Sequence, residues 1–135
     1  MNCPLCDAGA DRILWKDERC RVIRVADPDY PGFCRVVWNA HLGEMSDLAP
    51  AERQHLMSVV FATEAALREC MQPDKINLAS LGNLVPHVHW HVIPRFRDDR
   101  HFPQPIWGTP ERTPEQREPL ADEALAEAIA RHLDS

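Results

Sequence analysis

The stretch His87-Val88-His89-Trp90-His91-Val92-Ile93 carries the clearest structural signal in this chain. Alternate side chains of a β-strand lie on the same face, so this pattern predicts a strand with three histidines on one face. Val88, Trp90 and Val92 would then occupy the other face. A single histidine in a strand is usually a half-buried polar residue. Three in strict alternation, opposite an apolar face that already supplies the core, indicate a functional site.

One shared metal ion is a poor explanation for the three histidines. A strand rises about 3.3 Å per residue, which separates the Cα atoms of His87 and His91 by roughly 13 Å. Metal–nitrogen bonds are only about 2.0–2.1 Å long, so both outer rings would have to lean steeply inward. We therefore expect the three histidines to have different roles.

The segments around this strand predict an α+β domain with a five-stranded antiparallel sheet. Further strands are expected at residues 13–15, 21–25, 35–38 and 75–79. Apolar residues recur at spacings of three and four after the third strand, which predicts one long helix that Pro50 starts and Pro73 stops. Pro94 should limit pairing of the histidine strand. The proline-rich segment 95–119 should form an extended arm, and 121–133 a closing helix.

Composition restricts the class of protein. The chain has 135 residues, 44% of them hydrophobic, and a net charge of -6, which suits one globular domain and argues against a nucleic-acid binder. No stretch approaches the roughly 20 apolar residues of a membrane span, and the first residues lack the features of a secretory signal. Five cysteines, two of them in a Cys3-x-x-Cys6 pair, favour reduced thiols. These features predict a cytoplasmic protein without a membrane partner.

The histidine motif resembles the signature of the histidine triad (HIT) family of nucleotide hydrolases and transferases, His-φ-His-φ-His-φ-φ with φ apolar. All seven positions match, and 36–41 resembles the family's strand that ends in a further histidine. Segments 81–86 and 105–107 look most like the bacterial diadenosine tetraphosphate hydrolase-like branch. The resemblance implies a HIT-like domain over residues 1–108, with the arm and helix of 109–135 packed on the same domain.

The resemblance also implies the chemistry. His89 would attack the α-phosphate of a nucleotide, and water would then release a nucleoside monophosphate from the nucleotidyl-histidine intermediate. An unperturbed imidazole has a pKa of about 6.5 and is nucleophilic near pH 7, provided that its other N–H is held, for instance by a backbone carbonyl. His91 would bind the phosphate or the leaving oxygen, and His87 completes the catalytic set. The expected substrate-binding residues are Asn77, Gly82, Asn83 and Trp107.

Several of these assignments have a simpler alternative. Gly82 and Asn83 could form an ordinary turn, and Trp107 could cover a base or pack across a subunit boundary. Leu84 stands where many family members carry a hydroxyl, which leaves the expected phosphate pocket one donor short. The acidic balance is also unfavourable for an anionic substrate. Arg35, Arg95 and Arg97 could offset it, although a solvated surface role is expected for each alone.

Three functions are compatible with the motif. The first is hydrolysis or transfer at the α-phosphate of a dinucleoside polyphosphate, phosphoramidate or related nucleotide. The second is phosphorolysis, with phosphate in place of water. The third is a noncatalytic protein that senses nucleotides or metals. The resemblance further implies a homodimer that uses the long helix and the strand 75–79, and no organic cofactor is expected.

A structural zinc ion is the expected cofactor, held by Cys3, Cys6, His41 and His87. A Cys-x-x-Cys pair can chelate one ion, and two nitrogen ligands complete a tetrahedron. His87 is available for this role once His89 and His91 bind phosphate, and some bacterial HIT proteins resemble this arrangement. The remaining cysteines lack partners at ligand spacing and are expected to be small buried residues, namely Cys20, Cys34 and Cys70.

Overall fold

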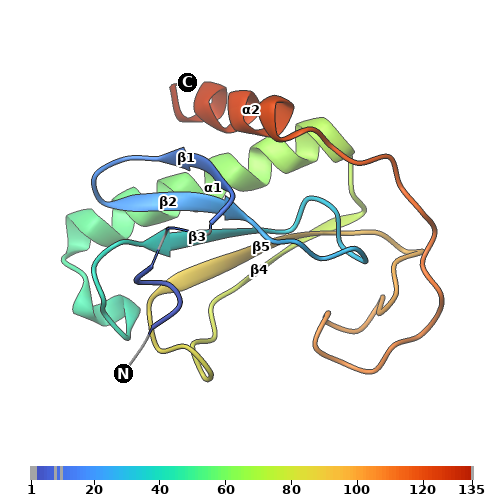
Figure 1. The fold of residues 1–135 in the computed structure, drawn as a ribbon, viewed down its shortest axis with the longest axis horizontal. Helices are drawn as coiled ribbons and strands as arrows, with labels where there is room; N and C mark the ends of the chain where they lie inside the picture. The colour runs from blue at the N-terminus through green and yellow to red at the C-terminus, as the bar shows by residue number, and fades with distance from the viewer. Residues whose placement is uncertain (1–2, 8, 10, 135) are drawn as a thin grey trace.

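The computed structural model describes residues 3–7, 9 and 11–134, so the outermost residues of the two predicted ranges, 1–108 and 109–135, lie outside it. Its five strands form one antiparallel sheet in the order β1-β2-β3-β5-β4 (Figure 1). The elements are β1 (Ile13–Lys16), β2 (Cys20–Arg24), β3 (Cys34–Trp38), the 3-10 helix η1 (Met45–Asp47), α1 (Pro50–Met71), β4 (Lys75–Ala79), β5 (His89–Arg95) and α2 (Asp122–Asp134). The predicted α+β class with two helices is confirmed.

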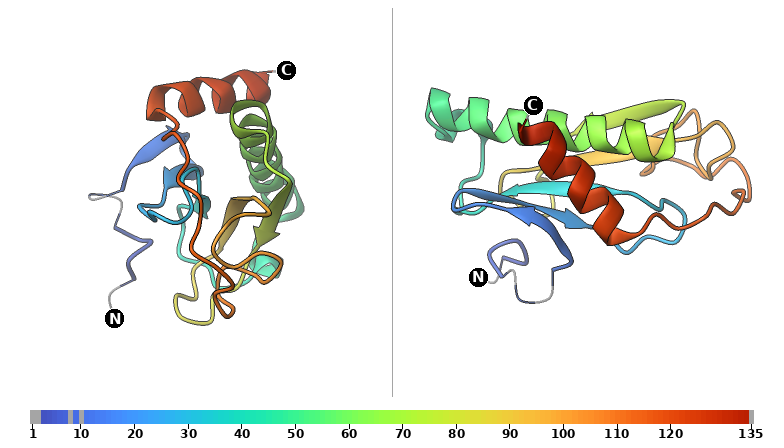
Figure 2. Two further views of the ribbon diagram at one scale, coloured as in Figure 1. Left: turned by 90° about the vertical axis from the view of Figure 1, so that its right-hand side faces the viewer. Right: turned by 90° about the horizontal axis from the view of Figure 1, so that it is seen from above.

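Both helices lie on the same side of the sheet (Figure 2). The main core fills the space between the sheet and the two helices. There Val22, Val36 and Val92 of the three central strands are fully buried with Leu56 of α1. The closing helix α2 packs against α1 and β1 and contributes Ile129 to the same core. The burial of these apolar residues is the main source of the free energy that stabilises the fold.

The opposite face of the sheet carries the polar residues that alternate with this core. The N-terminal segment crosses that face (Figure 2). Its Leu5 packs against Ile23 of β2 and Val37 of β3, forming a small second cluster. The strand histidines point to this face, away from the helices. The N-terminal cysteines are thereby held close to them.

The long helix begins and ends where the sequence predicts. Pro50 is its first residue, and the Glu52 carboxylate accepts a hydrogen bond from the Ala49 N–H at 2.7 Å. At the other end, Gln72 adopts the left-handed conformation (φ 52°) and donates its N–H to the carbonyl of Arg68. Pro73 follows directly. Among the described residues, no helix is both long and apolar enough to cross a bilayer.

The histidine strand differs from its prediction at both ends. We expected 87–93, whereas β5 spans His89–Arg95. His87 falls outside because its N–H bonds to the nearby carbonyl of Val85 at 2.8 Å, in a local turn that precedes the ladder. Pro94 limits pairing on one side: β3 pairs with β5 only as far as Val92, whereas β4 pairs through to Arg95. His87 is therefore free to point elsewhere than His89.

Candidate active site and metal centre

A pocket of about 440 Å³ lies on the sheet face opposite the helices, at the start of β5. It is large enough for a small-molecule ligand. Its walls come from the N-terminal segment, β3, the loop before β5, β5 itself and the arm. The lining residues are Pro4, Leu5, Arg35, Leu81, Gly82, Asn83, Leu84, Val85, His89, His91 and Trp107.

His89 has one ring nitrogen held and the other available. Its Nδ1 lies 2.6 Å from the carbonyl oxygen of His87, and because a carbonyl only accepts, Nδ1 carries the proton. The lone pair is then on Nε2. The side chain is 7% exposed, and burial lowers its pKa, against the carbonyl hydrogen bond and with a smaller contribution from Arg35. A neutral, nucleophilic imidazole at pH 7 follows from this environment.

His91 is the second histidine of the pocket. Its ring meets His89 edge-on at 4.9 Å between centroids and Trp107 at 5.1 Å. Its buried Nδ1 has no hydrogen-bond partner among the described residues. Burial, followed by His89 and Arg35, lowers the pKa of His91 to about 4, so this ring is also neutral near pH 7.

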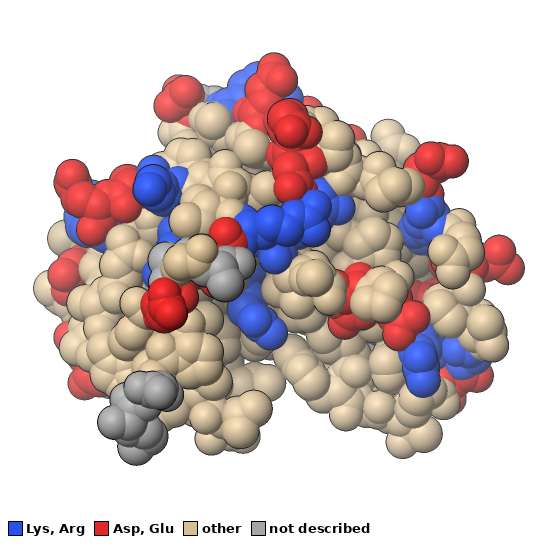
Figure 3. All heavy atoms as spheres, viewed as in Figure 1, with Lys and Arg blue, Asp and Glu red and all other residues tan. Residues whose placement is uncertain are grey.

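The three arginines considered from the sequence have different environments. Arg35 of β3 pairs with His91 of β5 and lines the pocket. Arg95 is 2% exposed and forms a buried ion pair with Asp99 at 2.8 Å. Arg97 is exposed. On the face of the molecule shown in Figure 3, basic side chains gather near the centre, above a hollow bordered by uncharged residues. Arg35 alone among the three contributes a charge to the pocket.

The predicted substrate-binding residues are only partly brought together. Gly82 and Asn83 line the pocket, and Gly82 has a φ of 79°, which favours glycine. Trp107 also lines it and remains 51% exposed. Asn77 is not among the lining residues, and its amide oxygen accepts a hydrogen bond from Arg95 at 2.8 Å. Leu84, at the position of the expected hydroxyl, is 93% exposed at the rim.

A second group of side chains lies beside the pocket and can hold one metal ion: Cys3, Cys6, His41 and His87. The Nδ1 atoms of the two histidines are 3.2 Å apart, and their contacts with the two sulfur atoms measure 3.3–3.5 Å. Tetrahedral zinc with bonds of about 2.0–2.1 Å to nitrogen and 2.3 Å to sulfur would separate N from N by roughly 3.4 Å and N from S by roughly 3.6 Å. The observed distances fit this geometry.

His87 uses both ring nitrogens outside the pocket. Its Nε2 donates to the carbonyl of Trp38 at 2.5 Å, which leaves the Nδ1 lone pair facing the two cysteines. Such a carbonyl partner orients a metal-binding histidine. His87 is 1% exposed and does not line the pocket. The geometry therefore suits a metal ligand, and the catalytic role expected for His87 from the triad pattern stays a prediction.

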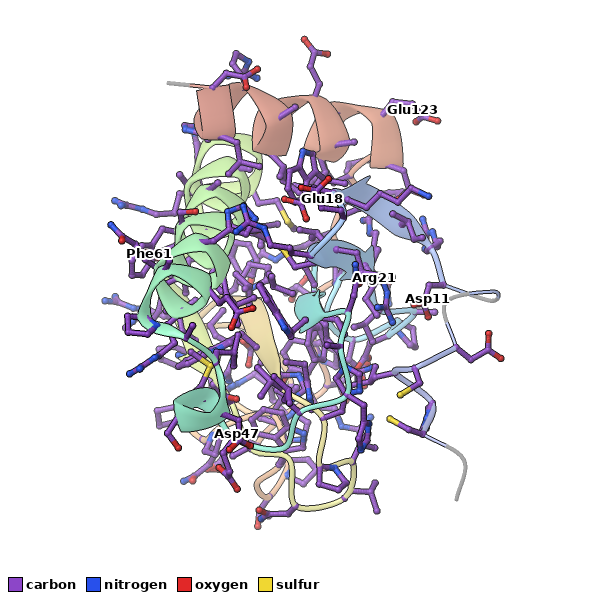
Figure 4. The ribbon with its side chains drawn as sticks, turned by 90° about the vertical axis from the view of Figure 1, so that its left-hand side faces the viewer. Asp11, Glu18, Arg21, Asp47, Phe61 and Glu123 are labelled. Atoms are coloured by element: carbon purple, nitrogen blue, oxygen red, sulfur yellow. The ribbon has the colours of Figure 1, made fainter. Side chains whose placement is uncertain are left out.

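A buried arginine that the sequence analysis did not single out positions the cysteine pair. Arg21 of β2 donates to the carbonyl of Leu5 at 2.7 Å and to the amide oxygen of Asn39 at 3.0 Å. Its Nε bonds to Asp11, also at 3.0 Å (Figure 4). Leu5 lies between the two cysteines, so Arg21 fixes the loop that carries them. The available signal was strand alternation, which places Arg21 on the same face as Ile23.

A further trio, Asp17, Cys20 and His55, also brings potential ligands together. Cys20 is fully buried, and burial, together with Asp17, raises the pKa of its thiol to about 12. The thiolate that a metal requires is therefore disfavoured. A hydrogen bond of 2.7 Å between Nε2 of His55 and the Asp17 carboxylate links the β1–β2 turn to α1. We interpret this trio as a structural contact.

The arm is fastened to the sheet through Asp99. The Asp99 carboxylate accepts hydrogen bonds from Arg95 at 2.8 and 3.1 Å, and from three backbone N–H groups, those of Phe96, His101 and Phe102, at 2.8–3.1 Å. Arg95 in turn donates to the carbonyl of Gln104 at 2.7 Å. Trp107 follows three residues later, so this network sets where the indole lies at the pocket.

The fold and the site together define a histidine triad protein, and comparison with known families agrees. The chain belongs to the HIT domain family, whose model matches residues 9–98. A histidine triad protein from Bradyrhizobium japonicum is 29% identical, with a TM-score of 0.72 and coverage of 90% of this chain and 89% of that one. A Zn-bound histidine triad family protein from Mycobacterium smegmatis shares the fold, with a TM-score of 0.67 at 22% identity and coverage of 99% and 94%.

Curated relatives with a named activity match a smaller part of the chain. An AP-4-A phosphorylase from Mycobacterium tuberculosis is 29% identical over 88 residues, which cover 61% of this chain. The same name and values apply to a second strain of that organism. The chain spans 45% of the length of these relatives.

Proposed function

We propose that this protein is a nucleotide hydrolase or transferase that cleaves at the α-phosphate of a nucleoside 5′-phosphate derivative. A dinucleoside polyphosphate or a nucleoside phosphoramidate is the substrate class, as in the diadenosine tetraphosphate hydrolase-like branch. The observation that carries the proposal is the orientation of His89, whose Nδ1–H donates to the His87 carbonyl while Nε2 is available at a buried pocket wall. This is the arrangement that a nucleophilic histidine needs.

In the first step, Nε2 of His89 attacks the α-phosphorus. The N–P bond forms as the bond from phosphorus to the leaving group breaks, and the leaving group departs with the electron pair and takes up a proton from solvent. His91, 4.9 Å from His89 between ring centroids, binds the phosphate or the leaving oxygen. The His87 carbonyl stabilises the positive charge that develops on the His89 ring.

In the second step, a water molecule attacks the phosphorus of the nucleotidyl-histidine. The new P–O bond forms as the N–P bond breaks, one proton passes to solvent, and nucleoside monophosphate leaves. His89 returns to its neutral state with Nδ1–H still on the His87 carbonyl. Gly82 and Asn83 contribute donors at the pocket wall for the phosphoryl oxygens, and Trp107 covers the base or the leaving group.

Incubation with a nucleoside phosphoramidate tests this reaction. Sustained release of nucleoside monophosphate that His89→Ala abolishes, with His132→Ala on α2 as a matched control, is the expected result. Binding without turnover by the wild-type protein would refute the enzyme and favour a noncatalytic nucleotide-binding protein. The name of the Mycobacterium tuberculosis relative favours one alternative, phosphorolysis. Phosphate in the assay distinguishes it, because phosphorolysis yields a nucleoside diphosphate.

We also propose that Cys3, Cys6, His41 and His87 bind a structural zinc ion, supported by the spacing of their ligand atoms. Bound there, the ion would join the N-terminal segment to the residues that precede β5 and would not touch substrate. All five cysteines are free, which suits a reducing compartment such as the cytoplasm.

Metal analysis of protein purified without a histidine tag should find about one zinc per chain, since the group offers one tetrahedral site. Cys3→Ser should lose the metal and melt at a lower temperature, whereas Cys70→Ser on α1 should retain it. Absence of zinc under reducing conditions, with unchanged melting of Cys3→Ser, would contradict this proposal.

A homodimer through α1 and β4 completes the proposal. In the described part of the sheet β4 is an edge strand, and an edge strand offers unpaired backbone groups to a second chain. Phe61 is 54% exposed on the outer side of α1 (Figure 4). Sedimentation at micromolar concentration should give a dimer that Phe61→Glu weakens. A single monomer-sized species in the wild-type protein would contradict it.

A further inference from the structure

Two buried side-chain nitrogen atoms in the described part of the chain have no hydrogen-bond partner, and both belong to pocket residues. They are Nε of Arg35 and Nδ1 of His91. The two residues are direct partners in the β3–β5 ladder, so their side chains leave the same face of the sheet. Buried polar groups are nearly always hydrogen-bonded. Two neighbouring exceptions in one pocket indicate that a ligand supplies the missing partner.

The environment of Arg35 contrasts with that of Arg21 on the adjacent strand. Arg21 lies on the same face and is fully engaged, by Asp11, Asn39 and the carbonyl of Leu5. Arg35 forms no hydrogen bond and no ion pair with any described residue; its guanidinium lies 5.7 Å from the Phe33 ring centroid. Of the carboxylates in the described ranges, Asp11 acts on it, and that group is already bound to Arg21.

An unpaired, half-buried cation is unfavourable in the ligand-free protein. Burial lowers the pKa of Arg35, which shows that its charged form is incompletely solvated. The two histidines that line the pocket beside it, His89 and His91, cannot carry a negative charge, so they provide no counter-charge. An anion in the pocket would remove this cost. Arginine is well suited to phosphate, because its planar fork donates two parallel hydrogen bonds.

We propose that Arg35 binds the nonbridging phosphoryl oxygens of the nucleotide and makes the pocket select phosphorylated over unphosphorylated nucleosides. This inference rests on the proposed nucleotide substrate, and it identifies the phosphate-binding residue. It also explains how a chain with a net charge of -6 recognises an anion. Arg35, from the strand next to the catalytic histidines, faces the pocket, and the described carboxylate that acts on it, Asp11, is bound to Arg21.

Calorimetric titration compares the affinity for AMP with that for adenosine, and for GMP with that for guanosine. The variants are Arg35→Gln, Arg35→Lys and Arg131→Gln. Arg131 lies on α2, in the layer on the other side of the sheet, so Arg131→Gln removes the same charge away from the pocket. We expect Arg35→Gln to reduce the preference for the nucleotide by roughly 10- to 100-fold, as for loss of a charged hydrogen bond. Arg35→Lys should recover part of the preference, and Arg131→Gln should keep all of it.

Thermal melting without ligand gives an independent readout. Because Arg35 has no protein partner, Arg35→Gln should melt at or above the wild-type temperature, whereas a structural arginine would melt lower. An unchanged nucleotide preference in Arg35→Gln, or a wild-type protein that binds nucleoside and nucleotide equally, would overturn the inference. Failure of the proposed reaction is separate: it appears as absent turnover of the phosphoramidate, with the Arg35-dependent preference intact.

Discussion

Replacing Asp99 with asparagine is expected to destabilise the protein and to loosen the arm beside the pocket. Asp99 is 5% exposed and its partner Arg95 2% exposed. The carboxylate accepts six hydrogen bonds: two from Arg95, three from backbone N–H groups and a long one, of 3.5 Å, from the Tyr30 hydroxyl. Asparagine keeps one acceptor oxygen and replaces the other with an NH₂ donor that would face the guanidinium. The substitution therefore leaves the Arg95 charge buried and uncompensated.

The magnitude follows from the burial of the pair. Breaking a buried ion pair by removing one partner costs about 3–5 kcal/mol. The remaining acceptor oxygen of asparagine and the Asn77 and Gln104 contacts of Arg95 favour the lower end of that range. A loss of about 3 kcal/mol, at about 4 °C per kcal/mol for a chain of this size, lowers the melting temperature by roughly 12 °C.

The effect should also depend on pH. Burial raises the pKa of Asp99, but hydrogen bonds from Arg95 and from the Phe96 and Phe102 amides outweigh it, so the folded pKa lies below the usual value. A carboxyl group whose pKa is depressed in the folded state stabilises the fold at pH values above its unfolded pKa of about 3.9. This stabilisation is lost as the pH falls through the folded pKa. The difference between wild type and Asp99→Asn should therefore be full at pH 7 and shrink on acidification below about pH 4.

Melting by circular dichroism and hydrogen exchange of residues 100–108 test the two parts of this prediction. Asp98→Asn is the matched control, since Asp98 is 46% exposed and pairs only with Arg117. The control should melt within about 2 °C of wild type, as for an ordinary surface substitution. An equally small shift in Asp99→Asn, without faster exchange in the arm, would refute the reasoning.

Three further substitutions test the pocket and the N-terminal loop. Leu84→Ser introduces a hydroxyl at the exposed rim. It should raise turnover by up to about tenfold, because it adds a hydrogen-bond donor for the phosphoryl oxygens, and leave the melting temperature unchanged. Lower turnover would show that the hydroxyl cannot reach the phosphate. Trp107→Ala should weaken AMP binding by roughly tenfold, because base stacking on an indole contributes about 1–3 kcal/mol; equal affinity in calorimetry would exclude a stacking role. Arg21→Lys cannot reproduce the forked contacts that include the Leu5 carbonyl, so a chelator should extract metal faster than from the wild type, and an equal rate would contradict that role.

Local sequence signals predicted the elements well where one periodicity dominated. The apolar spacing of α1, its Pro50 start and its Pro73 stop correspond to the observed helix, because burial and proline chemistry act within a few residues. The period of two also placed His89 and His91 on one face. His87 differs in that it lies before β5, and its ring contacts cysteines more than 80 residues away instead of lining the pocket.

The candidate site was predictable only in its residue types. The structure brings together the ligand atoms of the four Cys and His residues that ligand chemistry and resemblance had grouped, while the zinc ion itself stays a prediction. Asn77 stays a predicted substrate-binding residue, and in the structure its amide oxygen accepts a hydrogen bond from Arg95. Arg35 and Arg21 are indistinguishable in sequence as strand arginines. Their difference, one unpartnered and one fully bonded, arises from the strand order and from the path of the N-terminal segment.

One residue, His87, joins the two centres by different atoms. Its side chain contacts Cys3 and Cys6 through Nδ1, and its backbone carbonyl holds the Nδ1–H of His89. Cys3 is 84 residues from His87 along the chain. A change at its thiol is nevertheless separated from the ring that would carry the nucleotide by a single residue, His87. Oxidants, alkylating reagents or a bulky N-terminal fusion would consequently affect which ring nitrogen of His89 carries the proton, without entering the pocket. The two thiols therefore need the same protection during purification as the histidines.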